Sequence, residues 1–208
     1  MVSGFKGQSQ RILMFLLLNA RKPVSQLEIV TATGLSKGLV SRVVSLLVAK
    51  SVVKHPYRCR FVLEYPEKLL LDWIGQRNIS LKKAYFAKDA NVLKQVSHCH
   101  TLLSGAWLDS NYLASEFVTV YVEPGFVPTP AMKLVEGKVG QLKSKVVLIP
   151  ADDEFVFYGK RRINKKEVVN PFLLYVDLAS FGGIALTALQ QVSAKHGFPN
   201  LLEAKLNG

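Results

Sequence analysis

The sequence of 208 residues contains few cysteines, few acidic residues and no long apolar segment. Its two cysteines, Cys59 and Cys99, are too few for a disulfide framework, so we expect a reducing, cytoplasmic location. The longest apolar run, Ile12 to Leu18, is too short to cross a bilayer, and no signal-peptide cleavage pattern accompanies it. These absences argue against a membrane-spanning protein and against a disulfide-rich secreted one.

Acidic residues are outnumbered, because 27 Lys and Arg against 15 Asp and Glu give a formal net charge of +12. Residues 1–78 contain twelve cations and four acids, a net charge of +8, while the longer remainder carries +4. Such an excess suits a polyanionic partner, either nucleic acid or an anionic membrane surface. Because most of the charge lies in the first 78 residues, we expect the polyanion to bind there.

Residues 23–50 are predicted to form two helices joined by a tight turn. Ser25 is a good N-cap, and Glu28, three residues on, completes a capping box. Gly34 supplies the left-handed residue that ends the first helix, and Ser36 caps the second. Apolar residues recur at helical spacing in the second helix and predict one buried stripe, formed by Leu39, Val40, Val43, Leu46 and Leu47.

The opposite face of this second helix is polar, cationic and built from small side chains. It carries Ser36, Lys37, Ser41, Arg42 and Ser45. Hydroxyls and cations of this kind can approach the major groove of DNA closely and meet both phosphates and base edges. We therefore predict a helix-turn-helix whose recognition helix runs from residue 36 to 50. The alternative is an ordinary helical pair with a solvated polar face.

Two β-prone segments follow, at 52–54 and 58–63, with His55-Pro56-Tyr57 as the predicted turn between them. Alternate residues of the second segment, beginning with Cys59, are apolar and are expected to face the core. With a buried helix predicted at 8–19, this order is that of a winged helix. The wing would offer four side chains to backbone phosphates, namely Lys54, His55, Arg58 and Arg60. An alternative is that the wing binds a protein.

A shift in composition after a helix beginning at Pro66 predicts two domains, 1–78 and 79–208. The second domain mixes strands and helices without strict alternation, so the predicted fold class is α+β, with an N-terminal winged helix-turn-helix. Strands are predicted at 117–123, 145–149, 155–158 and 172–176, and helices at 184–195 and 200–206.

Two clusters of charged residues in the second domain are candidate functional sites. Asp152, Asp153 and Glu154, with a further carboxylate at Asp177, resemble the ligands of a metal-dependent nuclease. We expect the first three to form a hydrated acidic turn instead. Five cations between Lys160 and Lys166 predict a solvated loop, with a second DNA contact or a patch for an acidic protein as alternatives.

Two further motifs are too incomplete to predict a site. His98-Cys99-His100 has no second ligand cluster at a suitable spacing and is expected to be a partly buried turn. Gly182-Gly183 lacks the spacing of a phosphate-binding loop and is expected to be a strand-to-helix turn. We therefore expect no catalytic residue, cofactor or metal, and the metal-dependent nuclease is the alternative function.

Three segments of the second half, at 100–122, 146–159 and 168–189, follow the winged helix in an order that resembles one family. The chain resembles the AbiEi-type antitoxins of type IV toxin–antitoxin systems and their regulator relatives, most specifically at 103–106 and 170–183. The resemblance implies a repressor that binds inverted repeats at its own promoter and counters a nucleotidyltransferase-like toxin. Two half-sites imply two copies on the operator, as a homodimer or a cooperative pair.

Overall fold

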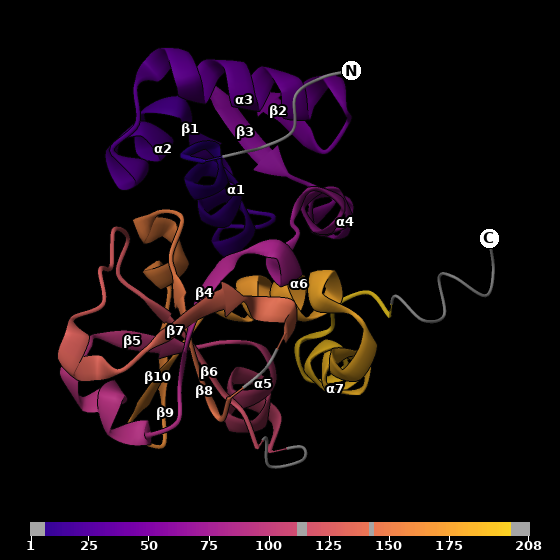
Figure 1. Ribbon diagram of the computed structural model, residues 1–208. Coiled ribbons are helices and arrows are strands. Elements are labelled where there is room, and N and C mark those ends of the chain that lie inside the picture. Colours follow the sequence, from indigo (N-terminus) through magenta and orange to yellow (C-terminus); the bar gives the residue numbers. More distant parts are fainter. Residues whose placement is uncertain (1–6, 112–115, 142–143, 201–208) are drawn as a thin grey trace. The chain divides into compact units, whose positions relative to one another are not determined.

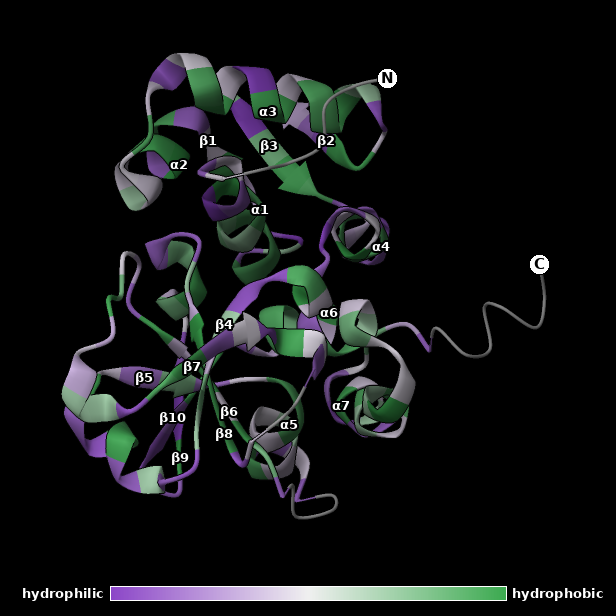
Figure 2. Ribbon diagram, viewed as in Figure 1, coloured by the Kyte–Doolittle hydropathy of each residue, from purple (hydrophilic) through white to green (hydrophobic). Residues whose placement is uncertain are grey.

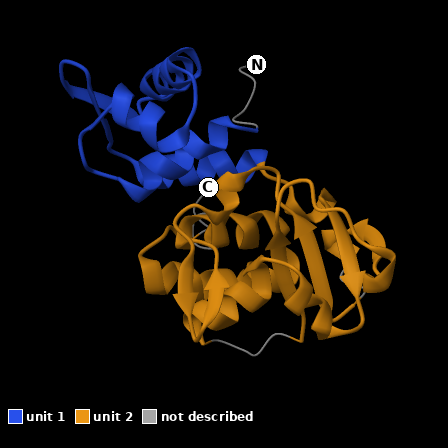
Figure 3. Ribbon diagram, turned by 90° about the vertical axis from the view of Figure 1, so that its left-hand side faces the viewer, with its two compact units in different colours: residues 1–76 blue, residues 77–208 orange. Residues whose placement is uncertain are grey.

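The computed structural model describes residues 7–111, 116–141 and 144–200. The chain divides into two compact units, residues 1–76 and 77–208, and contains both helices and strands, so the fold is α+β (Figures 1 and 3). The division falls two residues before the predicted domain boundary, because Arg77 is buried in the second unit against Asp177. Among the described residues, no helix is long and apolar enough to cross a bilayer.

Unit 1 combines helices with a three-stranded antiparallel sheet in the order β1-β3-β2 (Figure 1). Its elements are α1 (Ser9–Leu18), β1 (Val24–Ser25), α2 (Gln26–Thr33), α3 (Lys37–Ala49), β2 (Val53–Tyr57), β3 (Arg60–Leu63) and α4 (Pro66–Gln76).

The predicted ends of α2 and α3 are confirmed. The Ser25 hydroxyl accepts the Glu28 N–H at 3.1 Å, and the Glu28 carboxylate accepts the Ser25 N–H at 2.5 Å, which completes the capping box. Gly34 ends α2 with a φ of 68°, a left-handed conformation that glycine adopts without a steric penalty. The Ser36 hydroxyl caps α3 by accepting the N–H of Leu39.

The core of unit 1 is built around α1, which is apolar on nearly all sides and buried over most of its length (Figure 2). The predicted stripe of α3 is confirmed at Val40, Val43 and Leu47, which are buried. Leu39 and Leu46 are only half-buried, and Val44 takes a core position instead. The buried side of α3 is therefore rotated slightly from the predicted one, and its polar face is left at the surface.

The hairpin of unit 1 turns later than predicted. β2 continues to Tyr57, so the predicted turn at 55–57 is wrong and the loop is Arg58-Cys59. β2 is an edge strand whose register is irregular between Lys54 and Tyr57, so Pro56, which lacks an N–H, is tolerated there. Cys59, which was expected to face the core, is exposed in the loop with a φ of 63°.

Unit 2 contains a seven-stranded mixed sheet in the order β7-β4-β8-β6-β5-β10-β9. Its strands are β4 (Lys83–Ala87), β5 (His98–His100), β6 (Val118–Val122), β7 (Val135–Lys138), β8 (Val146–Pro150), β9 (Arg161–Ile163) and β10 (Lys166–Val168). Its helices are α5 (Leu102–Ser110), α6 (Pro171–Phe181) and α7 (Leu186–His196). Short 3-10 helices are η1 (Ile79–Leu81), η2 (Ala90–Gln95), η3 (Pro130–Met132), η4 (Val139–Gln141), η5 (Glu154–Phe157) and η6 (Gly183–Ala185).

The two faces of β6 show how the sheet of unit 2 is covered. Thr119 and Tyr121 point to the side of α5 and α6, where they hydrogen bond to residues of, or next to, those helices. Val120 and Val122, on the opposite face, belong to an apolar cluster with Leu148 and neighbouring residues. At β6, one face of the sheet thus carries polar side chains beneath helices, and the other packs into an apolar cluster.

The strands predicted at 117–123 and 145–149 are confirmed as β6 and β8, and the helix at 184–195 as α7. The other two predicted strands are wrong. Residues 155–158 overlap η5, which Asp153 caps, and residues 172–176 lie inside α6. Asn170 caps α6 and Pro171 occupies its first turn, a helix-start signal that outweighs the β-like composition.

Other predicted turns of unit 2 also differ. His98-Cys99-His100 is not a turn but strand β5, which lies inside the sheet between β6 and β10. The Lys160–Lys166 segment is largely the hairpin β9–β10 and not a loop. Gly182 and Gly183 connect two helices, α6 and η6, where a strand-to-helix turn was expected. All but the first residue of the helix predicted at 200–206 lie outside the described part of the chain.

Candidate nucleic-acid interface

The polar face of α3 lies at the surface of unit 1. Its predicted contact residues are all exposed, and they are Ser36, Lys37, Ser41, Arg42 and Ser45. Gly38 lies among them, and a Cβ added there would meet no atom within 4 Å, so the face is open. In the described part of the chain neither Lys37 nor Arg42 has a carboxylate partner, so both charges are available to a ligand.

Two of the predicted wing cations are already paired with carboxylates. The Lys54 amine lies 2.5 Å from the Glu64 carboxylate, and the Arg60 guanidinium lies 2.8 Å from that of Glu28. The Glu28 oxygen that receives Arg60 also accepts the Ser25 N–H of the capping box. Hydrogen bonds from Ser25, and then the charge of Arg60, lower the pKa of Glu28. Glu28 therefore ties strand β3 to the start of α2.

The remaining wing residues, His55 and Arg58, have different surroundings. The His55 ring packs on Phe61 at a centroid distance of 4.5 Å, which fixes it against the sheet. Arg58 lies in the exposed hairpin loop and has no carboxylate partner among the described residues. Of the four predicted wing residues, Arg58 is thus the cation that the fold leaves unneutralised. Sequence reasoning identified Glu28 as a cap but not as the partner of Arg60, because 32 residues separate them.

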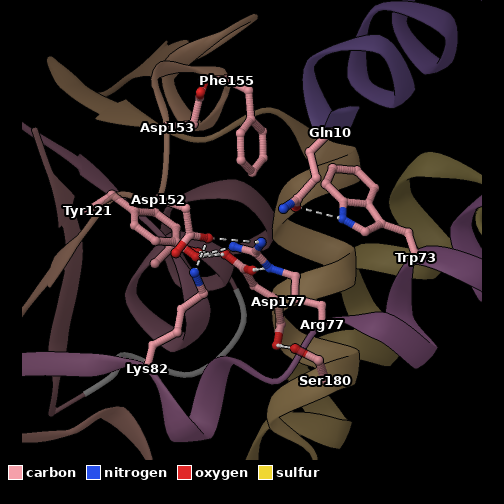
Figure 4. A network of polar contacts seen from close by, with 11 residues as sticks. Gln10, Trp73, Arg77, Lys82, Tyr121, Asp152, Asp153, Phe155, Asp177 and Ser180 are labelled. Atoms are coloured by element: carbon pink, nitrogen blue, oxygen red, sulfur yellow. Dashed lines mark hydrogen bonds and ion pairs between the residues drawn. The ribbon is translucent and has the colours of Figure 1, made fainter. Parts of the chain in front are cut away.

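Unit 2 holds a buried polar network around Arg77, which Figure 4 shows. The Arg77 guanidinium donates to the Asp177 carboxylate and to the Tyr121 hydroxyl, both at 2.5 Å. Tyr121 and Thr101 each donate to the other Asp177 oxygen at 2.8 Å. Burial by itself lowers the pKa of Arg77, but Asp177 and then Tyr121 overcome that effect and raise it. Arg77 is therefore a fixed cation.

The carboxylates proposed for a nuclease are separated by this network. Asp152 forms ion pairs with Lys82 and, at 3.8 Å, with Arg77, while Asp153 caps η5. Burial, and then the nearby Arg77, lower the pKa of the Lys82 amine, although its bond to Asp152 opposes them. Two cations thus occupy the space between Asp152 and Asp177 where a metal ion would need to bind.

The His98-Cys99-His100 segment is arranged unlike a metal site. Successive residues of a strand point to opposite faces of the sheet, so Cys99 cannot converge with the two histidines. Burial, and then the charge of Glu167, raise the pKa of the Cys99 thiol to about 12, which disfavours the thiolate that metals bind. Within the described residues, no group of three or more His, Cys, Asp and Glu side chains could hold a metal ion.

A second buried carboxylate, Asp109, lies at the end of α5. It receives Arg161 at 2.7 Å and the His196 ring at 2.9 Å, and Lys195 lies 3.6 Å away. Burial raises the pKa of Asp109, but the hydrogen bond from His196 and the charge of Arg161 lower it overall. These contacts join α5, α7 and strand β9, and the cations also suit the negative end of the α5 dipole.

No family model, no curated protein and no solved structure matches the chain.

Proposed function

We propose that this protein is a sequence-specific DNA-binding transcriptional regulator whose first unit is a winged helix-turn-helix. The observation that carries the proposal is the exposed face of α3, where Lys37, Ser41, Arg42 and Ser45 surround an open glycine. A helix with this face fits the major groove, and its short hydroxyl side chains let the backbone approach the bases. The order α1, α2, α3 and the hairpin β2–β3 supports this proposal, because it is the order expected of a winged helix.

Different cations of unit 1 would contact different parts of the DNA. Arg42 lies in the middle of the face and can donate two hydrogen bonds to the O6 and N7 atoms of a guanine. Lys37 lies in the first turn of α3, from which it would contact a phosphate. Arg58, in the hairpin loop, would contact the backbone of a flanking segment. Repression would follow from physical occlusion of the promoter.

The resemblance to AbiEi-type antitoxins makes this proposal more specific. The protein would bind inverted repeats at its own promoter, with two copies on the operator, and would counter a nucleotidyltransferase-like toxin. Purification of the tagged protein with its neighbouring gene products tests the toxin partner separately from DNA binding. Recovery of a nucleotidyltransferase-like protein supports the antitoxin role, and its absence leaves a regulator that acts alone.

Binding of the pure protein to its own upstream DNA is the direct test. Affinity is measured against a scrambled duplex of the same length at two salt concentrations, because non-specific binding is mainly electrostatic and falls steeply with salt. We expect a preference for the native sequence that survives the higher salt. Equal and salt-sensitive binding to both duplexes would show that the net charge of +12 alone attracts DNA.

Arg42→Ala tests the role of α3. We expect this variant to lose discrimination at one base pair, at a cost of about 1–3 kcal/mol, because one bidentate contact is removed. Binding to a set of operators with single substitutions measures the effect. Arg21→Ala, which changes an exposed cation outside α3, is the matched control and should keep the discrimination. Unchanged base preference in Arg42→Ala would contradict the assignment of α3 as the recognition helix.

The metal-dependent nuclease has no comparable support. Three of its four candidate carboxylates, Asp152, Asp153 and Asp177, each have a structural partner in unit 2. We therefore do not extend the proposal to DNA cleavage.

A further inference from the structure

We propose that the hairpin β9–β10 of unit 2 is a second nucleic-acid contact, separate from α3. Its tip, defined here as Arg162, Lys165 and Lys166, would bind the phosphodiester backbone, with Trp107 beside it as a surface for an unpaired base. This inference goes beyond the proposed regulator function because it assigns a ligand to unit 2.

The hairpin β9–β10 has a short turn of defined conformation. β9 and β10 pair antiparallel, and Ile163 lies opposite Lys166, so the loop consists of only two residues, Asn164 and Lys165. Their φ angles are 49° and 64°, and two positive values are the mark of a type I′ turn, which matches the twist of the strands. Lys165 is therefore held at the end of a tight hairpin and not in a loose loop.

Two of the five cations of this segment stabilise the hairpin itself. Lys160 pairs with Glu167 at 2.6 Å, and Arg161 pairs with the buried Asp109 at 2.7 Å. The three tip cations are exposed and have no carboxylate partner within the described part of the chain. The fold thus neutralises the cations at the base of the hairpin and leaves those at its tip as a local excess of positive charge.

Protection of the sheet edge does not account for the tip cations. β9 is the edge strand, and a charge there, such as Arg162, discourages pairing with another chain. Lys165 lies in the turn, however, and Lys166 lies on β10, which has β5 on one side and β9 on the other. Lys165 and Lys166 therefore do not protect the sheet edge.

An aromatic ring beside the tip favours nucleic acid over an acidic protein. The Lys166 amine lies over the half-buried ring of Trp107 on α5, 5.5 Å from its centre. A tryptophan next to cations that track a backbone is the combination with which proteins bind single strands, because every base can stack on a ring. Lys166 and Arg161 share the face of the hairpin that is turned to α5, since both make contacts with that helix.

The test compares two double variants of the full-length protein. In one, Arg162→Gln and Lys165→Gln neutralise two tip cations. In the control, Lys133→Gln and Lys138→Gln remove the same charge at and next to strand β7, at the other edge of the sheet. The affinity for a short oligonucleotide of random sequence, as a duplex and as a single strand, is measured over a range of salt concentrations.

We expect the tip variant to reduce the slope of log affinity against log salt by about 1.8 for the duplex or about 1.4 for the single strand, as two lost phosphate contacts predict. The control should keep the slope of the natural protein. A slope that is unchanged in the tip variant, or reduced equally in both variants, would overturn the proposal. An unchanged slope in the tip variant would mean that the tip cations do not contact phosphates, and an acidic protein would then be their alternative ligand.

Tryptophan fluorescence gives an independent readout at the same place. The protein has two tryptophans, and Trp73 is only 1% exposed, so a bound strand can quench Trp107 alone. We expect the single strand to quench the fluorescence of the natural protein and not that of Trp107→Phe. If the single strand does not quench the natural protein, base stacking at the tip is contradicted. The preference for the operator sequence depends on α3, so the tip variant should keep it. Measuring this preference therefore distinguishes a failure of this inference from a failure of the proposed regulator function.

Discussion

In unit 1 the ion pairs lie at the surface, whereas unit 2 buries its principal pair. Lys50 and Asp72 each keep 36% of their side-chain surface exposed, while Arg77 and Asp177 keep 3% and 0%. Exposed pairs contribute about 0–1 kcal/mol, because water screens them and holding two long side chains costs entropy. Removing one partner of a buried pair costs about 3–5 kcal/mol, because the other charge remains without compensation.

This difference separates charges that can meet a ligand from charges that cannot. Lys37 and Arg58 of unit 1 are exposed and have no carboxylate partner among the described residues, so they can bind a polyanion without first breaking an ion pair. Arg77 cannot leave Asp177 without unfolding its surroundings. In unit 2 the exposed tip of the hairpin β9–β10 likewise carries cations without a carboxylate partner among the described residues.

The largest expected effect is that of Asp177→Asn. Loss of the carboxylate leaves Arg77 buried without its counter-charge, and we expect unit 2 to be destabilised by about 3–5 kcal/mol. Asp72→Asn removes the carboxylate of the exposed pair with Lys50 and should cost less than about 1 kcal/mol. Urea unfolding, followed through Trp107 for unit 2 and Trp73 for unit 1, measures both. Equal losses in the two variants would refute the comparison.

The buried His100 adds a pH dependence to the stability of unit 2. Burial, then His98 and Lys166, lower the pKa of His100 to about 4, against about 6.5 in an unfolded chain. Between these values the unfolded state binds a proton that the native state does not, so stability should fall by roughly 3 kcal/mol as the pH drops from 6.5 to 4. His100→Asn should flatten this part of the stability curve, because the titrating group is removed. A His100→Asn curve as steep as that of the natural protein would contradict the assignment.

The two units also differ in how tightly they pack around a helical glycine. A Cβ on Gly105 would lie 3.0 Å from the Leu174 side chain and 3.2 Å from the His100 carbonyl oxygen, whereas one on Gly75 would meet nothing within 4 Å. We expect Gly105→Ala to destabilise unit 2 by about 1–3 kcal/mol through overpacking. Gly75→Ala should stabilise unit 1 by up to about 1 kcal/mol, because alanine favours the helix. Thermal unfolding measures both, and a stable Gly105→Ala would show that α5 can move away from β5.

The smallest expected effect distinguishes two arginines of the wing. Arg58→Ala should weaken binding to all DNA sequences and reduce the salt slope by about 0.9, because an unpaired cation is lost. Arg60→Ala should leave the slope nearly unchanged, because Glu28 already neutralises Arg60. Fluorescence anisotropy with a labelled duplex measures the slopes. An equal reduction in both variants would mean that Arg60 leaves Glu28 when DNA binds.

Local signals predicted the helix ends of unit 1 well. The capping box of Ser25 and Glu28, the end of α2 at Gly34 and the cap of α3 at Ser36 depend on atoms within a few residues, so the chain carries them in linear order. The exposed polar face of α3 was predicted for the same reason, since helical spacing separates a polar face from an apolar one. Whether that face binds DNA remains a prediction.

Short apolar runs could not be assigned in this way. Residues 172–176 have the composition of a strand, but their place in α6 depends on the cap at Asn170 and on burial against α5 and α7. Residues 55–57 have the composition of a turn, but an edge position lets β2 continue through Pro56. In both places the neighbours in space decide between conformations that the local composition leaves nearly equal.

The sequence by itself determined what interactions between near neighbours can hold: helix ends, the polar face of α3, the concentration of positive charge in the first 78 residues and the α+β class. Only the tertiary structure decided which charges stay available. Arg77 meets Asp177 across 100 residues and Arg60 meets Glu28 across 32. Linear order contains no signal for such pairs, because the two charges meet only when distant segments pack together.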